Sequence, residues 1–87
     1  MDKIQEIVGR NLKYYRYQCG LSQEKFYEKF GLNYKYLASV ERGEVNVSIE
    51  FLDNLAKLLK IDIRDFFNPD TERKITKKRI DEKLKED

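Results

Sequence analysis

The sequence predicts an all-α protein in which five helices form one small domain and a charged tail follows. Apolar residues recur three or four positions apart through most of the first 69 residues, which is the spacing of one helical face. Serine, asparagine or aspartate precedes four of the predicted helices, and such residues cap the free N–H groups of a first helical turn. Glycine follows three of them, where it ends a helix. We expect a helical domain over residues 1–69 and a separate tail over residues 70–87.

The first helix is expected to run from Ile4 to a point near Gly20. Its apolar or partly apolar positions are four, four, three and four residues apart and define one buried stripe, consisting of Ile4, Val8, Leu12, Tyr15 and Cys19. Cys19 has no neighbouring pattern of bases or cations that would mark a nucleophile. We therefore expect it to be buried as a small hydrophobic residue.

Two short helices are expected between Leu21 and Gly43. Ser22 can cap the first, and Gly31 can end it in the left-handed conformation that glycine adopts readily. Asn33 offers a second N-cap only two residues after the glycine, so the turn between the helices is short. The apolar residues of this stretch are Phe26, Phe30, Leu32, Leu37 and Val40.

The second of these short helices has one apolar face and one polar face. At about 100° per residue, five positions fall within a sector of about 140° opposite the apolar pair Leu37 and Val40, namely Tyr34, Lys35, Ala38, Ser39 and Arg42. The small alanine would let a partner surface approach the backbone. The phenol, the two cations and the hydroxyl can form hydrogen bonds and bind phosphate, and the major groove of DNA is wide enough to admit an α-helix. The polar face is therefore a candidate DNA-reading surface.

A fourth helix and a short fifth helix complete the predicted domain. Ser48 can cap the fourth helix, whose apolar stripe consists of Phe51, Leu52, Leu55, Ala56 and Leu59. Asp62 can cap the fifth helix, which extends from Ile63 to Phe67. Phe66 completes the core, which leaves Ile63 and Phe67 short of partners inside one protomer. We expect these two residues to lie in a symmetric dimer interface.

The composition excludes several classes of protein. There is no histidine and only one cysteine, so neither a disulfide framework nor a familiar zinc-ligand cluster can form. No nucleophile is paired with a base and no glycine-rich phosphate loop follows a strand, so we expect neither catalysis nor a cofactor. No apolar run approaches the roughly 20 residues that span a membrane, and the N-terminus is unlike a signal peptide. These features predict a cytoplasmic protein without a membrane partner.

Charge is unevenly distributed along the chain. Residues 1–42 carry eight cations and five acids, a net charge of +3, whereas residues 43–69 carry three cations and five acids, a net charge of −2. The positive part contains the candidate reading helix, as phosphate binding requires. The tail carries seven cations and six acids, and its sizeable apolar residues are Ile75, Ile80 and Leu84. A solvated helix, an arm that embraces a dimer partner and the start of a linker are all compatible with this pattern.

The residues around the glycine turn resemble those of the phage-repressor-like (Xre) helix-turn-helix family. The likeness extends from about Val8 to Phe67 and rests on four groups of residues, which are Gly20-Leu21-Ser22-Gln23-Glu24, Gly31-Leu32-Asn33, Tyr36-Leu37 and Val40-Glu41-Arg42-Gly43. It implies a transcriptional regulator that binds double-stranded DNA. Within the family, the chain is most similar to the small controller proteins of restriction-modification systems. Antitoxins and prophage repressors share the motif and are alternatives, as is a protein-interaction module that does not bind DNA.

The resemblance also implies roles for individual residues. Family members often pair an arginine at the position of Arg16 with a glutamate at that of Glu41, which implies a structural ion pair between the first and third helices. Direct DNA binding by these two residues is the alternative. Gln23 matches a glutamine that touches a phosphate or supports the reading helix, and Asn46 resembles positions that contact the DNA backbone. Tyr27 departs from the alanine usual in the family, so we expect a wider angle between the two helices or an outward-turned ring.

The predicted mechanism is binding of a homodimer to a two-fold operator. Each protomer would insert residues 33–42 into a major groove, with half-sites about 34 Å apart. The candidate base contacts are Tyr34, Lys35 and Ser39. Contacts to the DNA backbone position a protein without reading sequence, and the candidates for this role are Gln23, Asn33, Tyr36, Arg42 and Asn46.

Overall fold

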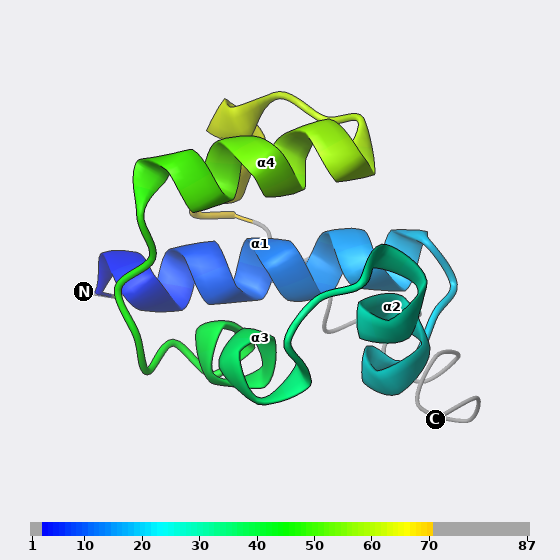
Figure 1. Ribbon diagram of the computed structural model, residues 1–87. Helices are drawn as coiled ribbons and strands as arrows, with labels where there is room; N and C mark the ends of the chain where they lie inside the picture. The colour runs from blue at the N-terminus through cyan, green and yellow to red at the C-terminus, as the bar shows by residue number, and fades with distance from the viewer. Residues whose placement is uncertain (1–2, 71–87) are drawn as a thin grey trace.

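The computed structural model describes residues 3–70, which contain four α-helices and one short 3-10 helix (Figure 1). The elements are α1 (Ile4–Gln18), α2 (Gln23–Phe30), α3 (Tyr34–Glu41), α4 (Ile49–Leu59) and the 3-10 helix η1 (Ile63–Phe67). The all-α class and the helical segments were thus predicted correctly, but the fifth segment is a 3-10 helix rather than an α-helix. The apolar residues of the tail, at positions 75, 80 and 84, lie outside the described residues.

Helix α1 is the central element of the domain (Figure 1). In this view α4 runs along one side of α1, and α2 and α3 lie on the other side. Helix α1 packs against α3 and η1, α2 packs against α3, and α4 packs against η1. None of the helices within residues 3–70 is both long and apolar enough to cross a membrane.

The helices begin where the sequence supplies a capping side chain. Four side-chain oxygens each accept a hydrogen bond of 2.9 to 3.2 Å from a backbone N–H of the following turn, those of Ser22, Asn33, Ser48 and Asp62. Helix α2 ends at Gly31, which has a φ of 65°, and most other residues would be strained in this left-handed conformation. The turn between α2 and α3 is therefore fixed locally at both of its ends.

Every helix contributes to one apolar core, which consists of Val8, Leu12, Phe26, Tyr27, Leu37, Val40, Leu52, Leu55, Ala56 and Phe66. Phe66 is fully buried, as predicted. In the predicted α1 stripe, Tyr15 is half-buried. Two other residues of the stripe are exposed, Ile4 at 53% and also Cys19. They lie at the two ends of α1, where the helical spacing continues but the packing does not. Ile63 is half-buried and packs against the core, so it has more partners within the protomer than expected, whereas Phe67 is 41% exposed.

Gly9 and Asn11 hold α1 against its neighbours, and neither role was predicted from the sequence. Gly9 faces the end of α3, where an added Cβ would lie 2.8 Å from the carbonyl oxygen of Glu41 and closer still to that of Val40. Only glycine allows the two helices to approach this closely. The buried Asn11 donates a hydrogen bond of 2.8 Å to the carbonyl oxygen of Phe66, which ties α1 to η1.

Candidate nucleic-acid interface

Helix α3 turns an apolar side inward and a polar side outward. Leu37 and Val40 are almost completely buried, whereas Tyr34 is 49% exposed and Lys35 is also exposed. Ala38 was predicted on the polar face, but it is only 6% exposed. That prediction failed because α3 packs against both α1 and α2, which buries a wider sector than one apolar pair indicates. The exposed surface of α3 is correspondingly narrower than predicted.

Ser39 and Arg42 extend this surface towards the end of α3. The half-buried Ser39 hydroxyl donates to the carbonyl oxygen of Lys35 at 3.1 Å and accepts from Arg42 Nη2 at 3.2 Å. Arg42 also forms two hydrogen bonds with Glu44, at 2.9 and 3.1 Å, and these raise the pKa of Arg42 and lower the pKa of Glu44. Both side chains of this ion pair are more than half exposed, so a phosphate group can replace the Glu44 carboxylate.

Three further candidates lie at the start of α3 and in the loop after it. Asn33 is exposed and caps α3, and a helix N-terminus attracts phosphate through its unpaired N–H groups and its dipole. Tyr36 is 36% exposed, and its ring packs edge-on against Phe51 of α4 with the centroids 5.3 Å apart. Asn46 is exposed in the loop between α3 and α4, where it borders an apolar hollow.

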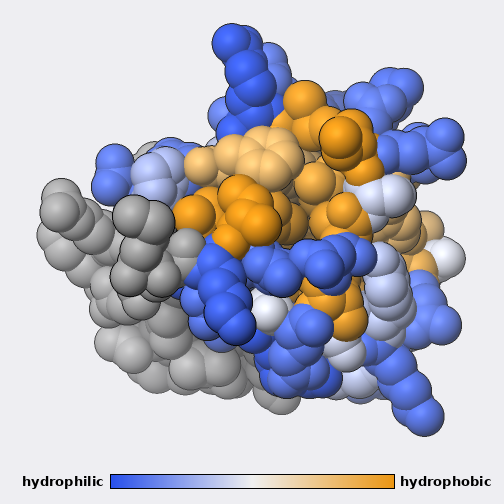
Figure 2. All heavy atoms as spheres, turned by 90° about the vertical axis from the view of Figure 1, so that its left-hand side faces the viewer, coloured by the Kyte–Doolittle hydropathy of each residue, from blue (hydrophilic) through white to orange (hydrophobic). Residues whose placement is uncertain are grey.

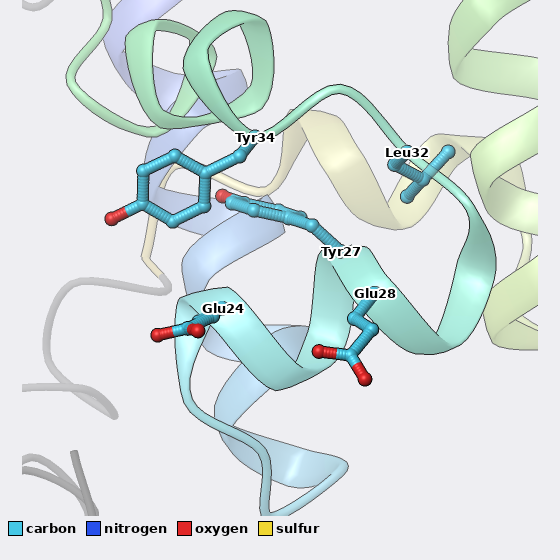
Figure 3. Close-up of a pocket in the computed structure, with 5 residues that line it drawn as sticks. All are labelled: Glu24, Tyr27, Glu28, Leu32 and Tyr34. Carbon is cyan, nitrogen blue, oxygen red and sulfur yellow. The ribbon is translucent and has the colours of Figure 1, made fainter.

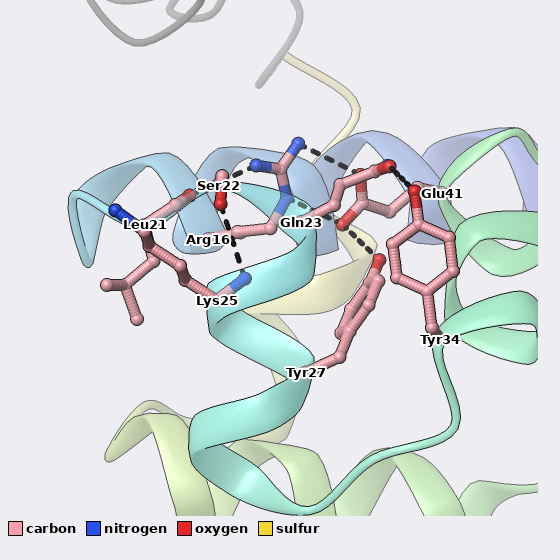
Figure 4. A network of polar contacts seen from close by, with 8 residues as sticks. All are labelled: Arg16, Leu21, Ser22, Gln23, Lys25, Tyr27, Tyr34 and Glu41. Carbon is pink, nitrogen blue, oxygen red and sulfur yellow. Dashed lines mark hydrogen bonds and ion pairs between the residues drawn. The ribbon is translucent and has the colours of Figure 1, made fainter. Parts of the chain in front are cut away.

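A buried ion pair lies beneath α3 and joins it to α1 (Figure 4). Arg16 Nε donates to Glu41 Oε2 at 2.9 Å, and Arg16 Nη2 donates to Glu41 Oε1 at 3.2 Å. Each of the two side chains is only 2% exposed. Burial acts to lower the pKa of Arg16, but the hydrogen bonds and the charge of Glu41 outweigh it, so the pKa is raised. Both members of the ion pair are therefore turned away from the exposed surface of α3.

Helix α2 supplies two more donors to the same carboxylate (Figure 4). Gln23 Nε2 donates to Glu41 Oε1, and the Tyr27 hydroxyl donates to Glu41 Oε2, both at 2.9 Å. Tyr27 is only 1% exposed, so the expectation of an outward-turned ring was wrong, because the phenol reaches the buried carboxylate. Burial, followed by the charge of Glu41, raises the pKa of Tyr27. We call Arg16, Gln23, Tyr27 and Glu41 the buried polar network.

Tyr34 connects this network to the surface. Its hydroxyl donates to Gln23 Oε1 at 3.4 Å, and its ring packs edge-on against Tyr27 with the centroids 5.3 Å apart and an interplanar angle of 73°. Figure 3 shows the two rings beside a hollow between α2 and the start of α3, with Glu24 and Glu28 on its rim. Two exposed carboxylates repel phosphate, so the hollow lies beside the candidate interface and not within its phosphate-binding part.

Residues 12–66 match the family model described as helix-turn-helix, HTH_3. The chain belongs to this Xre-type family of DNA-binding transcription regulators. Members of the family are regulators and not enzymes. In the helix-turn-helix motif, α2 is the first helix, Gly31 lies in the turn and α3 is the reading helix. No group of three histidine, cysteine or acidic residues that could hold a metal ion occurs within residues 3–70.

Several helix-turn-helix proteins are similar to this chain. Control protein C.SmaI of Serratia marcescens is 43% identical over 60 residues, which cover 69% of this chain and 71% of that protein. The HTH-type transcriptional regulator SinR of Bacillus licheniformis is 33% identical over 63 residues, covering 71% of this chain and 57% of SinR. The crystal structure of a hypothetical transcription factor, NHTF from Neisseria, aligns with a TM-score of 0.70 and 25% identity over 82% of each chain.

At two positions of this helix-turn-helix domain, the sequence contains a pattern from which the structural role could have been predicted. Glycine in a helix interior costs roughly 1 kcal/mol relative to alanine, so Gly9 in the middle of the first predicted helix indicated a close backbone approach. Tyr27 was noted as unusual, but no partner was assigned to its hydroxyl. A buried tyrosine hydroxyl usually has a hydrogen-bond partner, and the Glu41 carboxylate, for which the resemblance implied an ion pair with Arg16, was a candidate.

Proposed function

We propose that the protein is a homodimeric regulator that binds a two-fold operator and controls a restriction-modification system. The observation that supports this proposal most strongly is the arrangement of α3. Tyr34 and Lys35 of α3 are exposed, and Glu41, at the end of the same helix, bonds to Arg16 of α1 and Tyr27 of α2. A helix held in this way can enter a major groove as a rigid unit. The similarity to a control protein over more than two thirds of both chains supports the regulatory context.

The proposed contacts divide between bases and phosphates. Lys35 would donate to guanine O6 and N7, and Tyr34 would face a neighbouring base. Ser39 can offer only an acceptor, because its proton is directed to a backbone carbonyl. The proposed backbone contacts are Asn33, Tyr36, Arg42 and Asn46. Gln23 is the least exposed of the predicted phosphate contacts, and its amide nitrogen is already bonded to a carboxylate, so we assign it to support of α3.

The proposed dimer interface lies on the face where the start of α1 meets the α3–α4 loop. Figure 2 shows apolar side chains gathered on this face, and a hollow there is lined in part by Ile4, Val45, Val47, Ile49 and Phe67. We call these five residues the apolar face. Ile4, Ile49 and Phe67 are 53%, 76% and 41% exposed, and clustered exposure of this kind is typical of protein-interaction sites. Phe67 therefore stays in the proposed interface, whereas Ile63 packs against the core.

Selection of bound duplexes from a random pool tests the DNA-binding part of the proposal. We expect a two-fold motif whose half-sites are about one helical turn apart. Lys35→Ala should relax base preference at one position of each half-site. Arg42→Ala should weaken binding to all DNA sequences alike and reduce the dependence of the affinity on salt concentration. A wild-type protein that binds no duplex even at low salt would overturn the proposal, because nonspecific phosphate binding is strongest under that condition.

The regulatory context has its own test in the neighbouring genes. A methyltransferase gene and a nuclease gene beside this one, with the selected motif upstream of them, would support control of restriction and modification. A toxin gene or phage genes at that place would instead assign the protein to the antitoxins or the prophage repressors.

A further inference from the structure

We propose that Gln23 and Tyr27 position Tyr34 so that its phenol oxygen accepts a hydrogen bond from the amino group of adenine or cytosine. This inference rests on the proposed insertion of α3 into the major groove and names the class of base that Tyr34 reads. It also gives a function to Tyr27, the residue at which this chain departs from the usual pattern of its family.

The first step is the orientation of the Gln23 amide. An ionised carboxylate only accepts hydrogen bonds, and an arginine side chain only donates them. Glu41 already accepts two hydrogen bonds from Arg16 and one from Tyr27, so it faces the nitrogen of Gln23 and not the oxygen. That contact is 2.9 Å long. The amide oxygen of Gln23 must then point the other way, towards Tyr34.

The second step is the direction of the Tyr34 proton. An amide oxygen accepts and cannot donate, so the Tyr34 hydroxyl directs its proton to Gln23 Oε1, 3.4 Å away. This distance is longer than the typical 2.7–2.8 Å of an O–H···O hydrogen bond, and the bond alone would hold the phenol only weakly. The lone pairs of the phenol oxygen face away from Gln23.

The third step is the ring contact that holds Tyr34 in place (Figures 3 and 4). The edge-on contact with Tyr27, at 5.3 Å between centroids, is a favourable geometry for two aromatic rings. Tyr27 is itself immobilised, because it is buried and its hydroxyl is bonded to Glu41 at 2.9 Å. An alanine at position 27 would leave the Tyr34 ring without this support.

A phenol that has directed its proton inward can only accept from DNA. In the major groove, adenine N6 and cytosine N4 are donors, whereas guanine O6 and N7 and thymine O4 are acceptors. Tyr34 should therefore favour adenine or cytosine on the strand that it faces. One neutral hydrogen bond contributes about 1 kcal/mol, so the expected preference is about fivefold.

Selection from a random pool, followed by titration of the selected duplex and its single-base variants, tests the inference. We expect one position at which the wild-type protein prefers adenine or cytosine about fivefold. Tyr34→Phe should abolish this preference at that position alone. Gln23→Met and Tyr27→Leu should abolish it at the same position, and Tyr27→Phe, which restores the ring, should recover it relative to Tyr27→Leu.

Tyr36→Phe is the matched control, because it removes another exposed phenol of α3, whose ring packs against Phe51 of α4. This substitution should weaken binding to all duplexes alike and change no base preference. Thermal unfolding monitored by circular dichroism checks the fold of each variant, and if Tyr27→Leu does not fold, Tyr34→Phe and Gln23→Met decide the outcome.

Two kinds of failure are distinguishable in this experiment. A wild-type protein that selects no motif would overturn the proposed function itself. A selected motif with guanine or thymine at the Tyr34 position, or a preference that survives Tyr34→Phe or Gln23→Met, would overturn the inference and leave the function standing.

Discussion

The buried polar network and the apolar face both depart from the usual distribution of side chains, in which charged groups are exposed and apolar groups are buried. Beneath α3, the charged pair Arg16 and Glu41 is almost fully inside the protein. On the apolar face, Ile49 and Phe67 are outside it, at 76% and 41% exposed. The first region places charge where an apolar core is expected, and the second places apolar surface where a polar one is expected.

The two regions differ in whether a single protomer can stabilise them. No buried side-chain nitrogen or oxygen atom within residues 3–70 lacks a hydrogen-bond partner, so the network is complete in one protomer. The exposed apolar residues gain stability only when something covers them. Substitutions in the network should therefore change the unfolding of the monomer, and substitutions on the apolar face should change association.

The largest expected effect is that of Glu41→Ala. This change leaves the buried Arg16 guanidinium without its carboxylate, and breaking a buried pair in this way typically costs about 3–5 kcal/mol. The midpoint of urea unfolding should fall accordingly. Glu44→Ala is the matched control, because it removes an exposed ion pair with Arg42, and the midpoint should hardly move. An unchanged midpoint for Glu41→Ala together with lost operator binding would indicate instead that Glu41 acts directly on DNA.

On the apolar face, Ile49→Glu should separate association from folding. Burial of an isoleucine side chain contributes about 1.5–3 kcal/mol, and a two-fold interface loses two copies at once. We therefore expect the dissociation constant of the proposed dimer to rise about a hundredfold or more, as measured by analytical ultracentrifugation. The unfolding of the monomer should change little.

Leu58→Glu provides the control for Ile49→Glu. Leu58 is on the same helix and is 42% exposed, but it does not line the apolar hollow. Its substitution should leave the dimer intact. Equal effects of the two substitutions would argue against an interface at the apolar face.

A third substitution, Gly9→Ala, tests the spacing between α1 and α3 without changing any side chain of the network. The added Cβ collides with backbone carbonyl groups of Val40 and Glu41, and these cannot rotate away as a side chain would. Overpacking of this kind typically costs about 1–3 kcal/mol. We expect a lower urea midpoint and an unchanged dimer dissociation constant. A neutral or stabilising effect would show that the helices separate easily, and α3 would then not be a rigid unit.

The parts of the fold that depend on local chemistry were predicted from the sequence. Ser22, Gly31 and Asn33 act on backbone groups within a few residues of themselves, so their roles at the ends of α2 and α3 follow from residue type alone. The ion pair between Arg16 and Glu41 joins residues far apart in the chain, and only the family resemblance indicated it. Residue spacing gives the direction of a side chain but not the identity of its partner.

The errors concern packing between helices. Ala38 lies in the polar sector of α3 by angle, yet it is buried because α3 contacts two other helices. The Tyr27 ring turns inward because a carboxylate 14 positions further along the chain receives its hydroxyl. Neither outcome can be read from the periodicity of one helix, since both depend on how a second helix is placed.

The smallest expected effect is a difference in pH dependence between wild type and Tyr27→Phe. The pKa of Tyr27 is raised above its ordinary value of 10 in the folded protein, so above pH 10 the folded state holds a proton that the unfolded state releases. The contribution of Tyr27 is therefore complete below pH 10 and is lost as the pH rises beyond it. For one proton the loss is about 1.4 kcal/mol per pH unit.

Tyr27→Phe should be less stable than wild type at pH 8, because the hydrogen bond to Glu41 is missing, and the two proteins should converge above pH 10. Urea unfolding of both proteins at pH 8, 9, 10 and 11 measures this difference. A difference that stays constant across this range would mean that the Tyr27 hydroxyl is neither buried nor held beside the Glu41 carboxylate in the folded protein. The dimer dissociation constant should not follow this titration, because the five residues of the apolar face have no ionisable side chains.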